Sequence, residues 1–272
     1  MNKFAILGYN TINIGDDVQS FITSTLLDID YIILRDDYDI VYNFKTGEKC
    51  ILNENVFLIM NGWFMHNSNW KTGNNNIKFP IKNKFITPIY ISTCLSKDVP
   101  LLFTPQCIDH YKKHSPILCR DNTTLEILKK KGVNSYFFGC ITQLLDFDKV
   151  PNNEQYKDIY NDSVIYIDCK NLYDRRDKNE KAFYFEHYDN NLMKLNPKQR
   201  IDVAIDLYSK YKYASKIYSA RLHAFLPCRA MGLDVTYVGD LNYRVKDLVT
   251  KHPDKENIRN GFFKYIEEKT QS

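Results

Sequence analysis

Apolar runs alternate with amphipathic segments along the first half of the chain. Residues 3–8 form an apolar run, residues 9–16 are mostly polar, and apolar positions then recur at helical spacing through residues 18–26. This pattern predicts a strand, a loop and a helix in succession. Because alternating strands and helices are typical of α/β proteins, the pattern predicts an α/β fold.

Further elements of the first half follow the same alternation. We expect strands at residues 31–34, 40–44, 57–60, 89–92 and 101–104. Asp121 or Asn122 can cap a helix that runs to Lys131, and Gly132 is suited to end it. The first half is therefore expected to form one Rossmann-like domain, residues 1–147.

A stretch without apolar periodicity divides the chain. Residues 148–162, with the sequence DKVPNNEQYKDIYND, are polar and charged, so we expect a linker there. The second half repeats the alternation. Its expected elements are strands at residues 164–168, 182–186, 217–220 and 235–238, a helix opened by Asn196 and Pro197, and a helix at residues 222–231. The sequence thus predicts a second Rossmann-like domain, residues 163–272, which faces the first across a cleft.

The charge balance argues against nucleic acid as a partner. The 272 residues include 37 Lys+Arg and 33 Asp+Glu, so the formal net charge is +4, and no basic stripe is formed. The seven cysteines are scattered without zinc-type spacing, which indicates reduced thiols and no metal site. The N-terminus turns polar too early for a signal peptide, and no apolar run approaches the roughly 18 residues of a membrane span. We therefore expect a cytoplasmic protein without a membrane span.

The segment most informative about chemistry covers residues 214–239. An expected strand ends there, Arg221, Leu222 and His223 occupy the turn, and a helix begins at once. Ligands of open α/β sheets bind at the carboxyl ends of strands, where a helix N-terminus favours an anion. Arg221 offers a planar fork to carboxylate or phosphate, and His223 can exchange protons near neutral pH. A core histidine and a surface arginine remain an equally open interpretation at this point.

Pro227 affects the start of the same helix. It has no N–H to bond the carbonyl of residue 223, so a regular first turn lacks one hydrogen bond. The sequence therefore predicts either a distorted first turn or a helix that begins later.

Three elements of the sequence resemble the polysaccharide pyruvyltransferase family. Residues 219–224 read SARLHA and are followed by a proline, by AMG and by a valine, as in the C-terminal half of the family. Residues 13–19, NIGDDVQ, are similar to its N-terminal N-x-G-D-x-x-Q element. Residues 118–124, LCRDNTT, are similar to its central element. The three occur in the family's order and span most of the chain.

Members of this family transfer a pyruvyl group from phosphoenolpyruvate to sugar hydroxyls, and they resemble GT-B glycosyltransferases in having two facing Rossmann-like domains. The resemblance implies that His223 is catalytic and that Arg221 and Leu222 bind the donor. Arg120, in the central element, is expected to be a second anion ligand. Phosphoenolpyruvate would be a co-substrate, with no further cofactor and no metal.

An aromatic loop is the expected acceptor site. Residues 60–67 read MNGWFMHN, at the place where many family members carry a glycine-rich loop, and Trp70 follows. An aromatic ring face suits a sugar, so Trp63 or Trp70 can stack on the acceptor while Asn61 and His66 bond its hydroxyls. A core position for Trp63 is the alternative.

Two neighbouring carboxylates precede the first helix. Asp16 and Asp17 can position acceptor hydroxyls, although capping of the helix is the commoner role, and we expect it for one of them. Asp16 is the one we assign to the acceptor.

The expected reaction protonates the enol carbon of the donor, adds a sugar hydroxyl to C2 and expels phosphate, after which a second hydroxyl closes a ketal. The sequence leaves open whether His223 acts as acid or base, a role typically worth about 10² to 10⁴-fold. A GT-B-type glycosyltransferase that uses a sugar nucleotide is the alternative function. A saccharide-binding protein without activity is a third, and a homo-oligomer is compatible with each of them.

Overall fold

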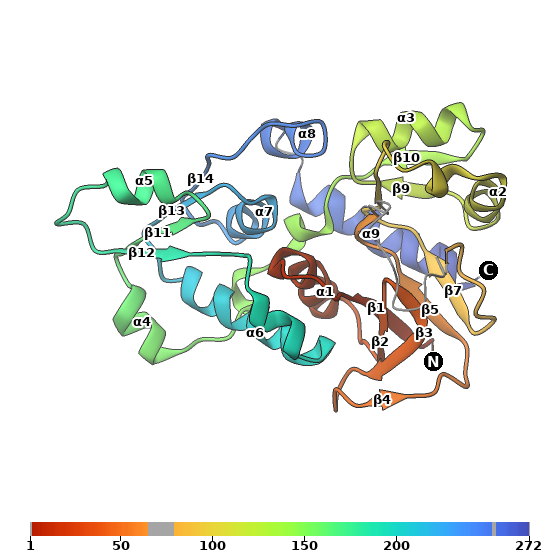
Figure 1. The fold of residues 1–272 in the computed structure, drawn as a ribbon, viewed down its shortest axis with the longest axis horizontal. Coiled ribbons are helices and arrows are strands. Elements are labelled where there is room, and N and C mark those ends of the chain that lie inside the picture. Colours follow the sequence, from red (N-terminus) through yellow and green to blue (C-terminus); the bar gives the residue numbers. More distant parts are fainter. Residues whose placement is uncertain (1, 65–78, 252–253, 272) are drawn as a thin grey trace.

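The structure is a computed structural model that describes residues 2–64, 79–251 and 254–271 (Figure 1). It is a mixed α/β fold with several parallel sheets. The helices are α1 (Ile14–Leu26), α2 (Pro105–Lys113), α3 (Asn122–Lys130), α4 (Glu154–Tyr160), α5 (Lys170–Arg175), α6 (Pro197–Tyr211), α7 (Leu222–Ala230), α8 (Lys246–Thr250) and α9 (Lys255–Gln271). The strands are β1 (Phe4–Gly8), β2 (Tyr31–Leu34), β3 (Asp37–Asn43), β4 (Lys49–Cys50), β5 (Val56–Ile59), β6 (Trp63–Phe64), β7 (Ile86–Ile89), β8 (Cys94–Leu95), β9 (Ile117–Cys119), β10 (Ser135–Phe137), β11 (Val164–Ile167), β12 (Ala182–Phe185), β13 (Lys216–Ser219) and β14 (Val235–Tyr237).

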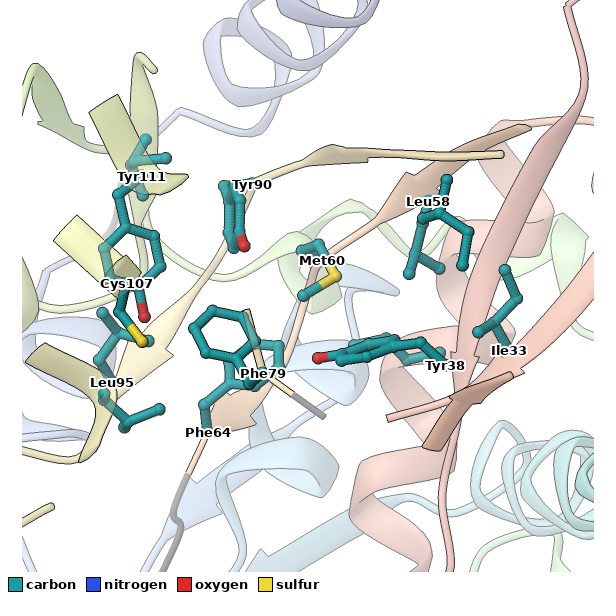
Figure 2. Packing of buried hydrophobic residues seen from close by; sticks show 14 of the residues in the cluster. Ile33, Tyr38, Leu58, Met60, Phe64, Phe79, Tyr90, Leu95, Cys107 and Tyr111 are labelled. Atoms are coloured by element: carbon teal, nitrogen blue, oxygen red, sulfur yellow. The ribbon is translucent and has the colours of Figure 1, made fainter. Parts of the chain in front are cut away.

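The larger sheet belongs to the first half of the chain and has the order β4-β3-β2-β1-β5-β7. Strands β2, β1, β5 and β7 are parallel, whereas β3 and β4 run antiparallel to their neighbours. One face packs on an apolar cluster that Figure 2 shows, in which Met60, just after β5, lies among Tyr38, Phe79 and Tyr90. The apolar runs expected at 3–8, 31–34 and 57–60 are confirmed as buried strands.

The second sheet is wholly parallel and has the order β12-β11-β13-β14. Chain order reverses between β11 and β13, because β12 lies on one side of β11 and β13 on the other. Such a switch point leaves a crevice at the carboxyl ends of the two central strands, where open α/β sheets bind ligands.

Helix α1 lies between the two sheets, at the centre of Figure 1. Its residues 14–23 are all buried. One apolar cluster runs from Ile6 of β1 through Phe21 and Ile22 of α1 to Ile165 and Ile217 of the second sheet. The N-terminus of α1 is therefore fixed against the second half of the molecule.

Asp17 of α1 does not cap its helix. The cap is Asn13, whose Oδ1 accepts a hydrogen bond from Gly15 N at 3.0 Å, so the capping role expected of Asp16 or Asp17 is wrong. Asp17 instead receives two hydrogen bonds from Arg200 of α6, at 3.0 and 2.7 Å, and both side chains are 1% exposed. A buried ion pair thus joins the two halves.

The last helix departs from the expected domain division. Helix α9 packs on the first half, where Phe262 and Ile266 join Ile89 and Ile91 in one apolar cluster. Lys269 Nζ donates to the carbonyl of His114 at 2.9 Å. In Figure 1 the chain accordingly ends beside the larger sheet, so α9 packs on the first half of the chain although it follows the second sheet in sequence.

Local signals at several element ends are confirmed. Asp121 Oδ1 caps α3 by accepting from Thr124 N at 2.8 Å, and Gly132, with φ +70°, follows the end of that helix. Asn196 and Gln199 form a capping box at α6. The strand expected at 101–104 is wrong. Residues Pro100–Phe103 form a 3₁₀ turn, since a proline is suited to the first position of a helix.

Across residues 2–64, 79–251 and 254–271, no helix is long and apolar enough to cross a membrane, and no cluster of three His, Cys, Asp or Glu side chains is arranged to hold a metal ion. All seven cysteines are free thiols.

The expected linker, residues 148–162, contains α4. Lys212, at the end of α6, holds it by donating to Val150 O at 2.9 Å.

Candidate active site

A pocket of about 250 Å³ lies where the N-termini of α1 and α7 meet the carboxyl end of the second sheet. Both halves of the chain contribute to its wall. The residues that line it are Asn13, Gly15, Asp16, Trp63, Arg120, His187, Tyr188, Ala220, Arg221, Leu222, His223, Tyr237, Asp240, Asn242, Arg244 and Val245. Ile14 N donates to His187 O at 2.9 Å, which fixes the start of α1 against the end of β12.

His223 occupies the distorted first turn of α7. Its φ of −83° and ψ of 15° are not helical, and Pro227 has no N–H to donate to its carbonyl. The hydroxyl of Tyr208 donates to that carbonyl instead. The distortion expected from Pro227 is confirmed, and Tyr208 supplies the hydrogen bond that the helix lacks.

The His223 ring is neutral at physiological pH. Burial, together with the charge of Arg120, lowers the pKa of His223 to about 3, although a hydrogen bond with the Gly15 backbone opposes the shift. Nε2 lies 3.9 Å from the Cys140 Sγ, so the Nδ1 edge faces Gly15 of α1. A neutral imidazole in contact with the pocket is able to accept a proton.

Arg221 is held in one direction by its neighbours. Its Nε donates to Asp168 Oδ2 at 2.5 Å and its Nη1 donates to the Tyr188 hydroxyl at 3.2 Å. The guanidinium carbon also lies 4.2 Å from the centre of the Tyr188 ring. Asp168, which follows β11, adopts a φ of +52°, a conformation rare for a residue with a side chain. The unusual backbone conformation therefore occurs at Asp168, the residue whose carboxylate orients Arg221.

Arg120 is a buried cation that forms no ion pair with any of the residues that the structure describes. It is 3% exposed, its Nη1 donates to Gln19 Oε1 at 3.4 Å, and its Nε has no hydrogen-bond partner. Its guanidinium forms no ion pair with a carboxylate of the described residues. Because a buried charge is costly unless it is paired, Arg120 and the pocket that it lines are suited to an anionic ligand.

The acceptor residues expected from the sequence are only partly brought together. Asp16 and Trp63 line the pocket. Asn61 does not. Its side chain is 0% exposed, and Nδ2 donates to Thr23 Oγ1 at 2.7 Å, so Asn61 ties α1 to the end of β5 rather than binding a substrate. His66, Asn67 and Trp70 lie outside the described residues.

His187 lines the pocket, although a structural or surface role was the expectation for it from the sequence. It is 1% exposed, and its Nε2 lies 3.1 Å from the Tyr211 hydroxyl. Burial lowers the pKa of His187 to about 4. The sequence feature that indicates a pocket position for His187 is its place after the expected strand 182–186, at the same sheet edge as Arg221.

We expect His187 to lower the free energy of unfolding as the pH falls below about 6.5. Its folded pKa of about 4 lies below the value of 6.5 for a free histidine, so the unfolded chain takes up the proton first as pH falls. The free energy of unfolding should therefore be lower at pH 5 than at pH 8 by about 2 kcal/mol from this residue. Urea unfolding at both pH values measures the loss. In His187→Gln the pH dependence should shrink by that amount, and an unchanged dependence contradicts the assignment.

Arg244 is a second pocket residue that the sequence did not single out. It follows β14, the last strand of the second sheet, and so occupies the sheet edge where ligands were expected. The same rule that drew attention to Arg221 would have found it. No motif marked it, because the polar segment after β14 has no distinctive spacing.

Comparison with known proteins supports the assignment of the fold and the family. The polysaccharide pyruvyl transferase family model matches residues 13–237. A crystal structure of a functionally uncharacterized protein from Klebsiella pneumoniae subsp. pneumoniae NTUH-K2044 is similar, with a TM-score of 0.50, 15% identity and coverage of 95% of this chain and 87% of that chain. At this identity the likeness shows the fold alone. No protein of curated function matches the sequence. Since the family model covers most of the chain, the protein belongs to the polysaccharide pyruvyl transferase family and is an enzyme of this type.

Proposed function

We propose that the protein transfers a pyruvyl group from phosphoenolpyruvate to two hydroxyls of a saccharide and releases phosphate. The observation that carries the proposal is the buried, unpaired Arg120 in one pocket with Arg221 and His223. A donor that carries both a carboxylate and a phosphate supplies the anionic partners that this pocket lacks. The N-terminus of α7, at Leu222, adds free N–H groups at the same place.

His223 is the proposed general base. Its neutral ring takes the proton of the first sugar hydroxyl as that oxygen bonds to C2 of the donor and then passes it to water, while the enol carbon takes a proton from water and becomes a methyl group. The C2–O bond to phosphate then breaks, and phosphate leaves with the bonding electrons. The second hydroxyl adds to C2 and gives up its proton, so the two protons lost by the sugar hydroxyls are balanced by one gained by the methyl group and one that leaves with phosphate.

The saccharide needs more room than the pocket provides. A second hollow of about 620 Å³ adjoins it and shares Ala220, Arg221 and Asp240 with it. We place the acceptor at the mouth between the two hollows, with Asp16 available to bond a hydroxyl.

The fold and compartment are part of the proposal. We propose a GT-B-like pair of Rossmann-like halves, supported by the two parallel sheets on either side of α1. A cytoplasmic location is supported by the seven free cysteines, since reduced thiols are typical of that compartment.

Incubation with phosphoenolpyruvate and a panel of β-galactosides, N-acetylhexosamines and their nucleotide-linked forms tests the function. We expect phosphate release that depends on one class of acceptor, together with an acceptor mass increased by one pyruvyl ketal. Parallel reactions with sugar nucleotides are the control. Nucleotide release from these, with no turnover of phosphoenolpyruvate, would establish the glycosyltransferase alternative.

Arg221→Lys should raise the KM for phosphoenolpyruvate and lower kcat, with a loss of about 10- to 100-fold in kcat/KM. The planar guanidinium of Arg221 can donate hydrogen bonds to Asp168 and to phosphoenolpyruvate at the same time, whereas the ammonium group of a lysine lacks this geometry. Steady-state kinetics with the donor varied measure the effect. Arg175→Lys is the matched control, because Arg175 is exposed at the end of α5 and does not line the pocket. If the control loses activity and Arg221→Lys does not, the donor site lies elsewhere.

A further inference from the structure

The side chain of Arg244 rests on Trp63. The guanidinium carbon of Arg244 lies 3.8 Å from the centre of the Trp63 ring, a cation–π contact. The tryptophan is itself fixed, because Arg35 Nη1 donates to Trp63 O at 3.0 Å and Trp63 pairs with Cys94 in the short sheet of β6 and β8. Arg244 therefore lies on an immobilised aromatic surface at the wall of the pocket.

The backbone around Arg244 is held in a turn. Asn242 Oδ1 accepts from Arg244 N at 3.0 Å, and Asn242 O accepts from Val245 N at 3.1 Å. Asp247, in the first turn of α8, accepts from Asn122 Nδ2 at 2.5 Å, which ties the segment to the first half of the chain. The direction of Arg244 is thus set from both halves of the molecule.

The charge of Arg244 is uncompensated. In the part of the chain that the structure describes, its guanidinium forms no ion pair with a carboxylate, whereas that of Arg221 is paired with Asp168. The charge of Arg244 also acts on His223. Burial is the main cause that lowers the pKa of His223, and the charges of Arg120 and Arg244 lower it as well.

We propose that Arg244 binds an anionic group of the donor and that Trp63 is the positioning residue that holds its guanidinium. The inference rests on the proposed function and extends it. Phosphoenolpyruvate carries two anionic groups, and Arg120 and Arg244 are the two pocket arginines without a carboxylate partner. The ring face of Trp63 that Arg244 covers is not open to a sugar, so the sugar-stacking role expected from the sequence is replaced by this one.

The fluorescence of Trp63 offers a test that needs no turnover. The chain has two tryptophans, so Trp70→Phe leaves Trp63 as the single emitter. Titration of this protein with phosphoenolpyruvate should give a saturable change in the emission of Trp63. The reason is that an anion bound to the guanidinium of Arg244 changes the contact of that group with the ring. In the same background Arg244→Gln should raise the Kd for phosphoenolpyruvate at least about tenfold. Lys246→Gln is the matched control, since it removes the same charge from an exposed residue outside the pocket, and it should leave Kd unchanged.

The outcomes separate this inference from the proposed function. If Arg221→Lys weakens phosphoenolpyruvate binding and Arg244→Gln, with an unaltered melting temperature, does not, the inference is overturned and the function stands. If a nucleoside diphosphate binds in place of phosphoenolpyruvate and Arg244→Gln weakens it, Arg244 is a donor ligand and the proposed donor is wrong. If neither anion binds the folded protein, both proposals fail.

The positioning role of Trp63 is tested by a double-mutant cycle with calorimetric titration. Trp63→Leu should weaken phosphoenolpyruvate binding, and Trp63→Phe should restore most of it, because a ring is retained. Added to Arg244→Gln, Trp63→Leu should cause no further loss, since the two act through one guanidinium. Additive losses would show that Trp63 acts independently of Arg244.

Discussion

His223→Asn is expected to lower kcat by about 10² to 10⁴-fold, while the melting temperature and the Kd for phosphoenolpyruvate stay close to those of the wild type. The proposed role of the ring is to take a proton in the transition state, and an amide cannot do so at neutral pH. Asparagine fits the site, because the carbonyl that Tyr208 bonds belongs to the backbone and is retained. Phosphate release, thermal melting and donor titration on one preparation measure the three quantities.

Tyr208→Phe is the comparison for His223→Asn. It removes the hydrogen bond to the His223 carbonyl and leaves the imidazole in place. We expect a smaller loss of kcat than in His223→Asn, since the imidazole is displaced but is still present to accept a proton. Activity of His223→Asn within a few-fold of the wild type would remove His223 from the mechanism. A collapsed fold in that variant would support the interpretation as a core histidine.

Asp17→Ala is expected to lower the free energy of unfolding by about 3 to 5 kcal/mol. The substitution leaves the guanidinium of Arg200 buried without its partner, and arginine does not lose its proton in proteins. Arg200→Leu should cost less, because burial raises the pKa of Asp17 to about 7 even beside Arg200, so a lone carboxyl at this place becomes neutral. Urea unfolding of both variants at pH 7 compares the two losses.

The double variant Asp17→Leu with Arg200→Met provides the control. It removes both charges and keeps apolar volume in the core between α1 and α6, so most of the stability lost in Asp17→Ala should return. Equal losses in Asp17→Ala and Arg200→Leu, with no recovery in the double variant, would contradict the account of an uncompensated buried charge.

Local sequence determined most of the elements that carry the site. The strand β13, the turn at Arg221 and the start of α7 were predicted in place, because a buried strand followed at once by a helix needs only nearby residues to be recognised. The distortion at His223 followed from Pro227 four residues later, since a missing N–H affects one defined carbonyl. The start of α3 was also predicted locally, with Asp121 or Asn122 as its cap, because a capping side chain bonds a backbone N–H only two or three residues away, and Asp121 is the cap that forms.

Long-range packing decided which residues share the pocket. Asp16 and Trp63 reach it from the first half of the chain, whereas Asn61, two positions from Trp63, is turned into the core to bond Thr23. The sequence of residues 60–67 does not show that Trp63 lines the pocket and Asn61 does not. Whether a side chain faces a ligand or a helix depends on which part of the chain packs against it. Arg244 joined the site through a cation–π contact with a residue 181 positions earlier (244 − 63).

Local patterns along the chain were enough to predict the alternation of strands and helices in α6, α7 and the parallel sheets, the cap of α6 at Asn196 and the turn that presents Arg221 and His223, but not the cap of α1. The tertiary structure alone decided the pairing of Asp17 with Arg200, 183 positions apart, and the return of α9 to the first half. The physical reason is the range of the interactions. The hydrogen bonds within a helix and its caps act within a few residues, whereas ion pairs and apolar faces find partners according to which surfaces the whole chain buries together.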